Sequence, residues 1–311
     1  MAFFLLNMNI KRLRIILAAS FSGLGILCSV LGFTGALNNH TYSRKYADWL
    51  SKVGDNTLLR DVSLPGSHDT MALYSVADLA GQCQTLSLEE QLNLGVRFLD
   101  VRLKEDHNSL KAVHGFIDQK ATFADINKTV TSFLDKHPSE FIIMSIKEEA
   151  DPSSSDLSFE QALLTYLDSP LYLKEQKTVP QYVKDIRGKI LLLSRYQNSS
   201  IGVPAYDGWK DSTSFTLTND IYIQDTYKIT SKEQKQEEIV KCFNEAGHTL
   251  KINFLSAYRT DGFPPSYAMS AAKDINHWIN KEIDKYQDRG IVLYDFISET
   301  NMNAFFKEAN K

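Results

Sequence analysis

Eight short apolar runs, most of them separated by segments with helical spacing, constrain the fold of this chain more than any other feature. Several runs, such as Phe141–Ile146 and Lys189–Ser194, are almost uninterrupted, which is typical of strands covered on both faces. The predicted strands are 58–64, 96–103, 110–113, 141–146, 189–194, 221–224, 250–256 and 290–294. Alternating strands and helices predict a parallel sheet, and eight such units predict closure into a (βα)8 TIM barrel.

Helical periodicity fills most of the intervals between these runs. The predicted helices are 42–50, 86–94, 123–137, 159–167, 231–246 and 268–286, and the predicted loops are 151–155 and 197–220. Ser87 is expected to cap the second helix, and His137-Pro138 to end the third. Pro65 and Gly66 are expected to stop the first strand, so that His68 follows on a turn.

Each predicted strand is followed by ionisable or polar residues. In a (βα)8 barrel the active site lies at the carboxyl ends of the strands, so closure would bring these residues into one pocket. In chain order the ends are His68/Asp69, Asp100/Arg102, His114, Lys147, Arg195, Asp225/Tyr227, Ser256 or Tyr258, and Asp295.

This set of residue types suits the cleavage of a phosphodiester. Of two histidines, one can act as base and the other as acid at neutral pH, and each needs a carboxylate to fix its tautomer. Asp69 and Asp295 are available for that purpose. An arginine such as Arg102 can hold two phosphate oxygens in its planar fork.

The motifs that carry these residues resemble a known family. Pro65-Gly66-Ser67-His68-Asp69, Asp100-Val101-Arg102 and Val113-His114-Gly115, in this order, resemble the X region of phosphatidylinositol-specific phospholipase C, and most of all its bacterial secreted members. The pattern continues through Ser145–Lys147, Arg187–Tyr196, Gln224–Tyr227 and Leu293–Phe296, and covers about residues 48–305.

The resemblance implies a single-domain, imperfect (βα)8 barrel and a role for each residue. His68 is implied as general base and His114 as general acid, with Asp295 orienting His68 and Asp69 assisting His114. Arg102 is implied to bind the phosphate with support from Asp100. The implied inositol-binding residues are Lys147, Arg195, Asp225 and Tyr227. The products would be diacylglycerol and inositol 1,2-cyclic phosphate, with phosphatidylinositol or its glycan-linked anchors as substrates.

The resemblance also bears on cofactors. In the eukaryotic relatives a calcium ion neutralises the phosphate, whereas an arginine in that place supplies the charge without a metal. We therefore expect metal-independent catalysis and no cofactor. Glu148 and Glu149 are interpreted as part of a charged loop after a buried strand, although carboxylates can also be metal ligands.

The first residues differ in kind from the rest of the chain. Lys11, Arg12 and Arg14 precede an apolar run from Ile15 to Phe33 and small residues that end at Ala36. This order predicts a signal peptide over residues 1–36 and a secreted barrel over 37–311, or a membrane anchor if the segment is uncleaved. Cleavage would change the formal net charge from −4 to −7, which argues against nucleic-acid binding.

Two further features concern the membrane partner and the cysteines. The expected partner is phosphatidylinositol in a membrane, bound transiently by a monomer, and Phe263 and Tyr267 could contact the lipid or pack against the adjacent helix. Cys83 and Cys242 could form a disulfide or remain separate buried thiols.

Two rival functions stay open from the sequence. One is a metal-dependent glycerophosphodiesterase, against which Arg102 argues. The other is a catalytically silent lipid-headgroup binder, against which the retention of both histidines and their candidate acids argues.

Overall fold

The computed structural model describes residues 44–75, 81–260 and 268–307. The chain divides into a unit of residues Met1–Tyr42 and a unit of residues Ser43–Lys311, and every described residue belongs to the second. The predicted signal segment 1–36 therefore lies outside the described residues. Within the described part of the chain, no helix has the length and apolar character needed to cross a bilayer.

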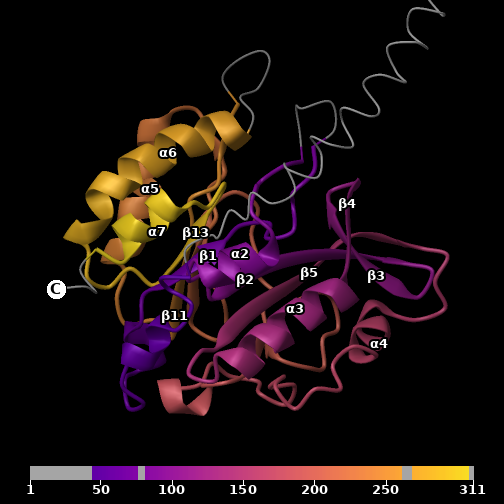
Figure 1. Cartoon of the computed structure of the whole chain (residues 1–311). Coiled ribbons are helices and arrows are strands. Elements are labelled where there is room, and N and C mark those ends of the chain that lie inside the picture. The colour runs from indigo at the N-terminus through magenta and orange to yellow at the C-terminus, as the bar shows by residue number, and fades with distance from the viewer. Residues whose placement is uncertain (1–43, 76–80, 261–267, 308–311) are drawn as a thin grey trace, which may run out of the picture. The chain divides into compact units, whose positions relative to one another are not determined.

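A curled, mostly parallel sheet forms the centre of this unit (Figure 1). Its parallel strands are, in spatial order, β6 (Ile190–Arg195), β5 (Ile142–Ser153), β2 (Phe98–Asp106), β1 (Leu64–Ser67), β13 (Ile291–Tyr294), β11 (Leu250–Phe254) and β9 (Ile221–Gln224). β7 (Val203–Pro204) extends the sheet beyond β6, and β8 (Ser214–Thr216) pairs antiparallel with β9. No pairing between β7 and β8 joins the two ends, so the sheet is an incomplete barrel over the described residues.

The predicted strand 110–113 exists as β3 (Ser109–His114), but it is not a barrel strand. It pairs antiparallel with β2 and forms a hairpin with β4 (Ile117–Thr122) that projects beside the sheet (Figure 1). The reason lies in its connection to β2, which consists only of His107 and Asn108, both at positive φ. Such a two-residue turn reverses the chain, whereas a parallel crossover needs a dozen residues or more.

The first strand differs from the predicted range 58–64. Residues Leu59–Asp61 form a 3₁₀ turn, η2, and β1 runs through Pro65 and Gly66 instead of stopping before them. The Pro65 carbonyl accepts a hydrogen bond from the Arg97 amide at 2.9 Å. At Gly66 a Cβ atom would lie 3.0 Å from the Cβ of Phe98, so glycine permits the close approach of β1 and β2. Both residues thus act as strand residues here.

Helices cover the outside of the sheet. They are α2 (Leu88–Asn93), α3 (Phe123–Lys136), α4 (Phe159–Leu164), α5 (Lys232–Asn244), α6 (Ala268–Glu282) and α7 (Glu299–Phe305). Ser87 caps α2 in a reciprocal box with Glu90, as predicted. The described part of the predicted helix 42–50 is instead a turn followed by the 3₁₀ turn η1 (Trp49–Lys52). The remaining elements are η3 (Val183–Asp185), η4 (Ile283–Lys285) and the short pair β10 (Lys228–Ile229) and β12 (Tyr258–Arg259).

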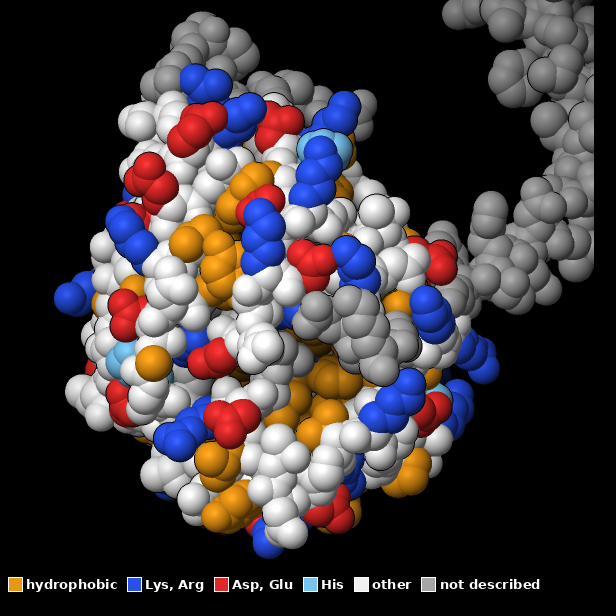
Figure 2. Space-filling model, turned by 90° about the vertical axis from the view of Figure 1, so that its left-hand side faces the viewer, with side chains coloured by type: hydrophobic (Ala, Val, Ile, Leu, Met, Phe, Trp, Pro, Cys, Tyr) orange, Lys and Arg blue, Asp and Glu red, His pale blue; other side chains and the backbone are white. Residues whose placement is uncertain are grey.

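Two apolar cores follow from the alternation of side chains along each strand. In β13, Ile291 and Leu293 belong to the core enclosed by the sheet, whereas Val292 and Tyr294 belong to the core between the sheet and the helices. Around these cores the surface is mixed. On the side of α5, α6 and α7, Figure 2 shows basic and acidic side chains interspersed, with small hydrophobic groups between them.

The amino ends of the strands are held by a buried ion pair. Arg97, just before β2, contacts Glu140, just before β5, at 2.7 Å, and neither side chain is exposed. The Arg97 guanidinium also donates to the carbonyl oxygens of Tyr46 and Ala47, and Glu140 accepts from the Leu50 amide. The pair therefore fastens the residues before β1 to the base of the sheet.

Candidate active site

A cavity of about 710 Å³ opens at the carboxyl ends of the strands. Its lining includes most of the residues predicted at strand ends, namely His68, Arg102, His114, Lys147, Arg195, Asp225, Tyr227, Ser256 and Tyr258. The predicted residues Asp69, Asp100 and Asp295 are buried directly behind this lining, in contact with it. Phe263 and Tyr267 lie outside the described residues. The structure therefore brings every other predicted site residue together, whereas their catalytic roles remain predictions.

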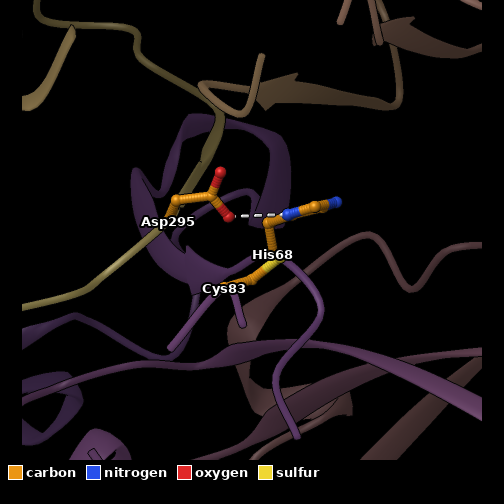
Figure 3. A group of neighbouring side chains, drawn as sticks. All are labelled: His68, Cys83 and Asp295. Carbon is orange, nitrogen blue, oxygen red and sulfur yellow. Dashed lines mark hydrogen bonds and ion pairs between the residues drawn. The ribbon is translucent and has the colours of Figure 1, made fainter. Parts of the chain in front are cut away.

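His68 is fixed on both sides of its ring. Its Nδ1 lies 2.7 Å from Asp295 Oδ1 (Figure 3), and its Nε2 lies 2.8 Å from Nη2 of Arg102. A guanidinium only donates, so Nε2 is the acceptor and the proton is on Nδ1, facing the carboxylate. Burial lowers the pKa of His68, but the Asp295 carboxylate raises it by more, so the net shift is upward from 6.5. Nε2 is thus the unprotonated, basic nitrogen of a ring that lines the cavity, and it accepts from Arg102 in this structure.

Arg102 is surrounded by carboxylates. Its Nη2 lies 3.0 Å from Asp100 Oδ2, and its Nη1 lies 3.6 Å from both Asp69 and Glu149. Burial alone would lower the pKa of Arg102, but these carboxylates hold it well above its usual value. Arg102 therefore stays charged in a side chain that is only 13% exposed.

Asp100 connects the two buried arginines. Its Oδ1 accepts from Arg195 at 3.1 Å, while its Oδ2 accepts from Arg102 and from the Asp69 amide. Burial raises the pKa of Asp100, but the two guanidinium groups lower it by more, so the net value is well below the usual range. Asp100 is therefore ionised and fixes the orientation of both guanidinium groups.

His114 lies across the cavity floor, at the end of β3. Its Nδ1 donates to the Gly81 carbonyl at 2.9 Å, and its Nε2 lies 3.5 Å from Asp69 Oδ2. Asp69 is 1% exposed and Oδ2 has no hydrogen-bond partner among the described residues, and burial raises its pKa. Nε2 of His114 is therefore the nitrogen available for proton transfer, next to a carboxylate.

Several lining residues are not among the predicted site residues, and two of them, Glu149 and Trp209, contact predicted ones. Glu149 was interpreted as part of a charged loop, but β5 continues to Ser153 and directs it at Lys147 (2.6 Å) and Arg102. This extension exists because the long β2 continues to pair with β5 beyond Lys147, through bulges. Burial raises the pKa of Glu149, but the two cations lower it by more.

The second is Trp209, in the stretch predicted only as a loop. Its ring lies under the Arg195 guanidinium at 3.5 Å, and its Nε1 donates to Asp225 at 3.2 Å. A cation stacked on indole is held in place without losing its outer N–H donors. A tryptophan in a polar, glycine-containing loop is the one sequence signal that could have indicated this position.

The strand-end segment Asp225–Tyr227 forms the opposite wall. The Tyr227 hydroxyl donates to Asp211 at 2.5 Å, and burial with this contact raises the pKa of Tyr227 to about 12. Behind the segment, Lys235 of α5 is fully buried and donates to the Thr226 carbonyl at 2.7 Å. Burial lowers the pKa of Lys235 to about 7. This contact holds the turn that presents Asp225 and Tyr227.

The donor atoms around the cavity do not suit a calcium ion. Among the described residues, two groups of three potential metal ligands come within 4.8 Å of one another, and both include the Cys83 thiol. Calcium is bound by six to eight oxygen atoms, so neither group fits it. Cys83 and Cys242 are both free, buried thiols, which answers the open question of a disulfide between them.

A barrel that gathers two histidines, paired carboxylates and buried arginines at its strand ends fits the class of enzymes that cleave phosphodiesters by acid–base chemistry. The sequence profile of the phosphatidylinositol-specific phospholipase C X domain matches residues 62–196. The chain is 31% identical to a Listeria monocytogenes 1-phosphatidylinositol phosphodiesterase, over 83% of this chain and 84% of that one. A Staphylococcus aureus protein of the same name is 28% identical, over 78% and 84%.

The fold agrees with these sequence matches. The structure of phosphatidylinositol-specific phospholipase C from Listeria monocytogenes superimposes with a TM-score of 0.70 and 27% identity, over 84% of this chain and 98% of that one. The chain therefore belongs to the phosphatidylinositol-specific phospholipase C family. The resemblance and the imperfect, TIM-barrel-like α/β fold that it implies are both confirmed.

Proposed function

We propose that this protein cleaves phosphatidylinositol to diacylglycerol and inositol 1,2-cyclic phosphate. The observation that carries the proposal is the position of the Arg102 guanidinium, between a basic nitrogen of His68 and the Asp69–His114 pair. A phosphate held by this fork has a base on one side and an acid on the other. The names of the Listeria and Staphylococcus relatives support the same substrate.

The proposed reaction has two proton transfers. His68 Nε2 takes the proton of the inositol 2-hydroxyl, whose oxygen attacks phosphorus and forms the cyclic ester. The bond between phosphorus and the glycerol oxygen breaks, and His114 Nε2 gives its proton to that oxygen. Asp295 stabilises the imidazolium on His68, and Asp69, 3.5 Å from His114 Nε2, assists His114 at the leaving oxygen. Hydrolysis of the cyclic product follows if the two histidines exchange roles.

The opposite wall suits the inositol ring. Charged groups of Lys147, Arg195 and Asp225 line the same cavity and match a ring of hydroxyl groups, while the Tyr227 ring offers an apolar surface. We assign inositol binding to these residues. Glycan-linked phosphatidylinositol shares the same reacting group, so it remains a second candidate substrate.

We also propose that catalysis needs no metal. Arg102 provides a fixed positive charge where the phosphate binds, and the described donor groups near it do not form an oxygen cage. A metal-dependent glycerophosphodiesterase is the alternative that this proposal opposes.

The enzyme is further proposed to be a secreted monomer that acts transiently at the membrane surface. Phe116 supports the interfacial part, because it is 91% exposed at the turn of the β3–β4 hairpin, two residues after His114. The acid that protonates the leaving group must lie next to diacylglycerol, whose acyl chains are in the bilayer. The hairpin tip is therefore expected to face lipid.

Phosphorus NMR of phosphatidylinositol vesicles treated with the purified enzyme in excess chelator tests the proposal. Inositol 1,2-cyclic phosphate is the expected first product, and His68→Ala is expected to abolish it. Activity that appears only after a divalent ion is added would contradict metal-free catalysis. A folded protein that forms no product from any phosphoinositide would favour the headgroup-binding alternative.

A further inference from the structure

We propose that Cys83, His68 and Asp295 form an inhibitory site for a thiophilic divalent cation such as Zn²⁺ or Cd²⁺. One ligand atom from each of the three side chains lies within 4.8 Å of the other two. Figure 3 shows the Cys83 side chain beside the hydrogen-bonded His68–Asp295 pair. The proton-transfer roles described above make no use of this thiol, although it lines the cavity.

The three donors suit a soft or borderline cation. Thiolate, imidazole and carboxylate are the ligands that zinc takes in proteins, and catalytic zinc sites use three protein ligands and leave a fourth position open. A second observation, independent of the thiol, also indicates a bound cation. Asp295 Oδ2 is buried and has no hydrogen-bond partner among the described residues. A cation can reach the group because Cys83 and His68 line the cavity.

The backbone holds the ligands in place. The Cys83 amide donates to the Ala72 carbonyl at 2.9 Å, and its carbonyl accepts from the Phe296 amide, next to Asp295, at 2.7 Å. Gln84 donates to the carbonyl oxygens of His68 and Tyr294 at 2.8 Å each. The segments that carry the three ligands are therefore tied to one another before any cation binds.

A second group, Asp69, Cys83 and His114, shares the same thiol. Its free carboxylate oxygen lies 3.6 Å from the Arg102 guanidinium, which repels a cation. In the His68 group, Arg102 contacts the ring at Nε2 and not at the Nδ1 that faces Asp295, and none of the described ion pairs places a lysine or arginine on Asp295. The His68 group is therefore favoured, and one thiol can serve only one site at a time.

Binding would remove the basic nitrogen. Burial, together with the Asp295 and Asp69 charges, raises the pKa of the Cys83 thiol, so the cation must displace its proton to solvent. It must also take the place of the proton on His68 Nδ1. A neutral imidazole with a cation on Nδ1 carries its proton on Nε2, so His68 could no longer accept one there.

The experiment titrates untagged full-length enzyme with CdCl₂ and ZnCl₂. Binding is measured by calorimetry and by the ultraviolet cadmium–thiolate band, and inhibition is measured on phosphatidylinositol relative to each variant's own activity. Cys83→Ser is compared with Cys242→Ser, since Cys242 is the other described free thiol and is equally buried. Cys28 is present in all the proteins. Thermal unfolding confirms that each variant is folded.

We expect Cys83→Ser to abolish the thiolate band and to weaken binding and inhibition by more than about tenfold, the least that loss of an outer-shell partner costs. Cys242→Ser should bind as the unchanged protein does. Binding should persist in His114→Gln and fail in His68→Gln, which separates the two groups. Equal affinity in Cys83→Ser, or no thiolate band in the unchanged protein, would overturn the site.

Only the inhibition measurement rests on the proposed function. Cation binding at Cys83 without any turnover of phosphatidylinositol would support the site while refuting the function. Turnover of phosphatidylinositol without cation binding at Cys83 would support the function while refuting the site.

Discussion

At the scale of single residues, His68 is held between a carboxylate that stabilises its charged form and a guanidinium that opposes it. Burial is the largest effect and also lowers the pKa of His68, but the Asp295 carboxylate outweighs burial and Arg102, because the net pKa shift is upward. A general base works only when it is neutral, so activity is lost as the pH falls through the raised pKa. The acid limb of the pH–rate profile is therefore expected above pH 6.5, the ordinary value for histidine.

Asp295→Asn should move that limb to lower pH and reduce the maximal rate. The amide keeps an acceptor for Nδ1 but removes the main charge that raises the pKa, so burial and the Arg102 charge, which both lower it, outweigh the Asp100 charge. A fall in kcat of about 10²-fold or more is expected, the range of general acid–base effects. The measurement is kcat/KM against pH. The exposed His248–Asp220 pair supplies a matched control, and Asp220→Asn should leave the profile unchanged. A limb that stays in place in Asp295→Asn contradicts the assignment.

The substitution Arg102→Lys keeps the positive charge but removes the planar guanidinium group. Because a lysine cannot hold two phosphate oxygens in fixed geometry, kcat should fall by about 10²- to 10³-fold, as when a transition-state donor is removed. Steady-state kinetics on phosphatidylinositol would measure this. Arg187→Lys is the control, since Arg187 pairs with Asp55 and does not line the cavity. Similar losses in both variants would mean that the effect is structural.

Sequence reasoning identified residues that follow strands in recognisable motifs, such as His68 and Arg102. It did not identify Glu149 or Trp209, because their positions depend on tertiary structure. Glu149 reaches the cavity only because β5 continues in register with β2. Trp209 reaches it from a stretch whose local composition specifies no regular structure.

At the scale of elements, the β3–β4 hairpin combines two tasks. It carries His114 at the end of β3 and Phe116 in the turn that follows. A two-residue turn explains why this strand departs from the predicted parallel sheet, and turn geometry of this kind is harder to infer than a long helix. The capped helices α2 and α3 were predictable because their caps and periodicity are local features.

Phe116→Ser tests the hairpin tip. Vesicle binding should weaken about tenfold, since partial insertion of a phenylalanine contributes less than the 1.5–3 kcal/mol of full burial. Hydrolysis of water-soluble inositol 1,2-cyclic phosphate should be unchanged. Leu164→Ser, at an exposed leucine that ends α4 away from the cavity, is the control. Equal loss on the soluble substrate would show that Phe116 acts on the active site and not on the membrane.

At the scale of the whole unit, one end of the barrel carries the candidate active site and the other end stabilises the fold. The carboxyl ends gather the reactive groups, and the amino ends are secured by Arg97 and Glu140. The alternation of strands and helices made the barrel predictable. The open edge between β7 and β8 was not, because such short pairings leave little trace in a single sequence.

Glu140→Gln should destabilise the unit without changing the chemistry. It leaves the Arg97 cation buried and uncompensated, which costs about 3–5 kcal/mol. In urea unfolding the midpoint should fall at a constant slope, while the activity per folded molecule stays the same. Glu282→Gln removes a surface pair with Lys285 and should cost less than about 1 kcal/mol. A similar small cost at Glu140 would mean that the buried pair contributes little.

The open edge also bears on behaviour in concentrated solution. An unpaired strand edge is a template for other chains, and the opening of the barrel leaves two such edges, at β7 and β8. Here β7 has two residues, one of them Pro204, which has no N–H to offer. The Pro204 carbonyl already accepts from Nδ2 of the Asn219 side chain, and β8 is only three residues long. Neither of these two edges offers a neighbouring molecule a run of free backbone groups to pair with, so the opening of the barrel is protected against strand-by-strand polymerisation.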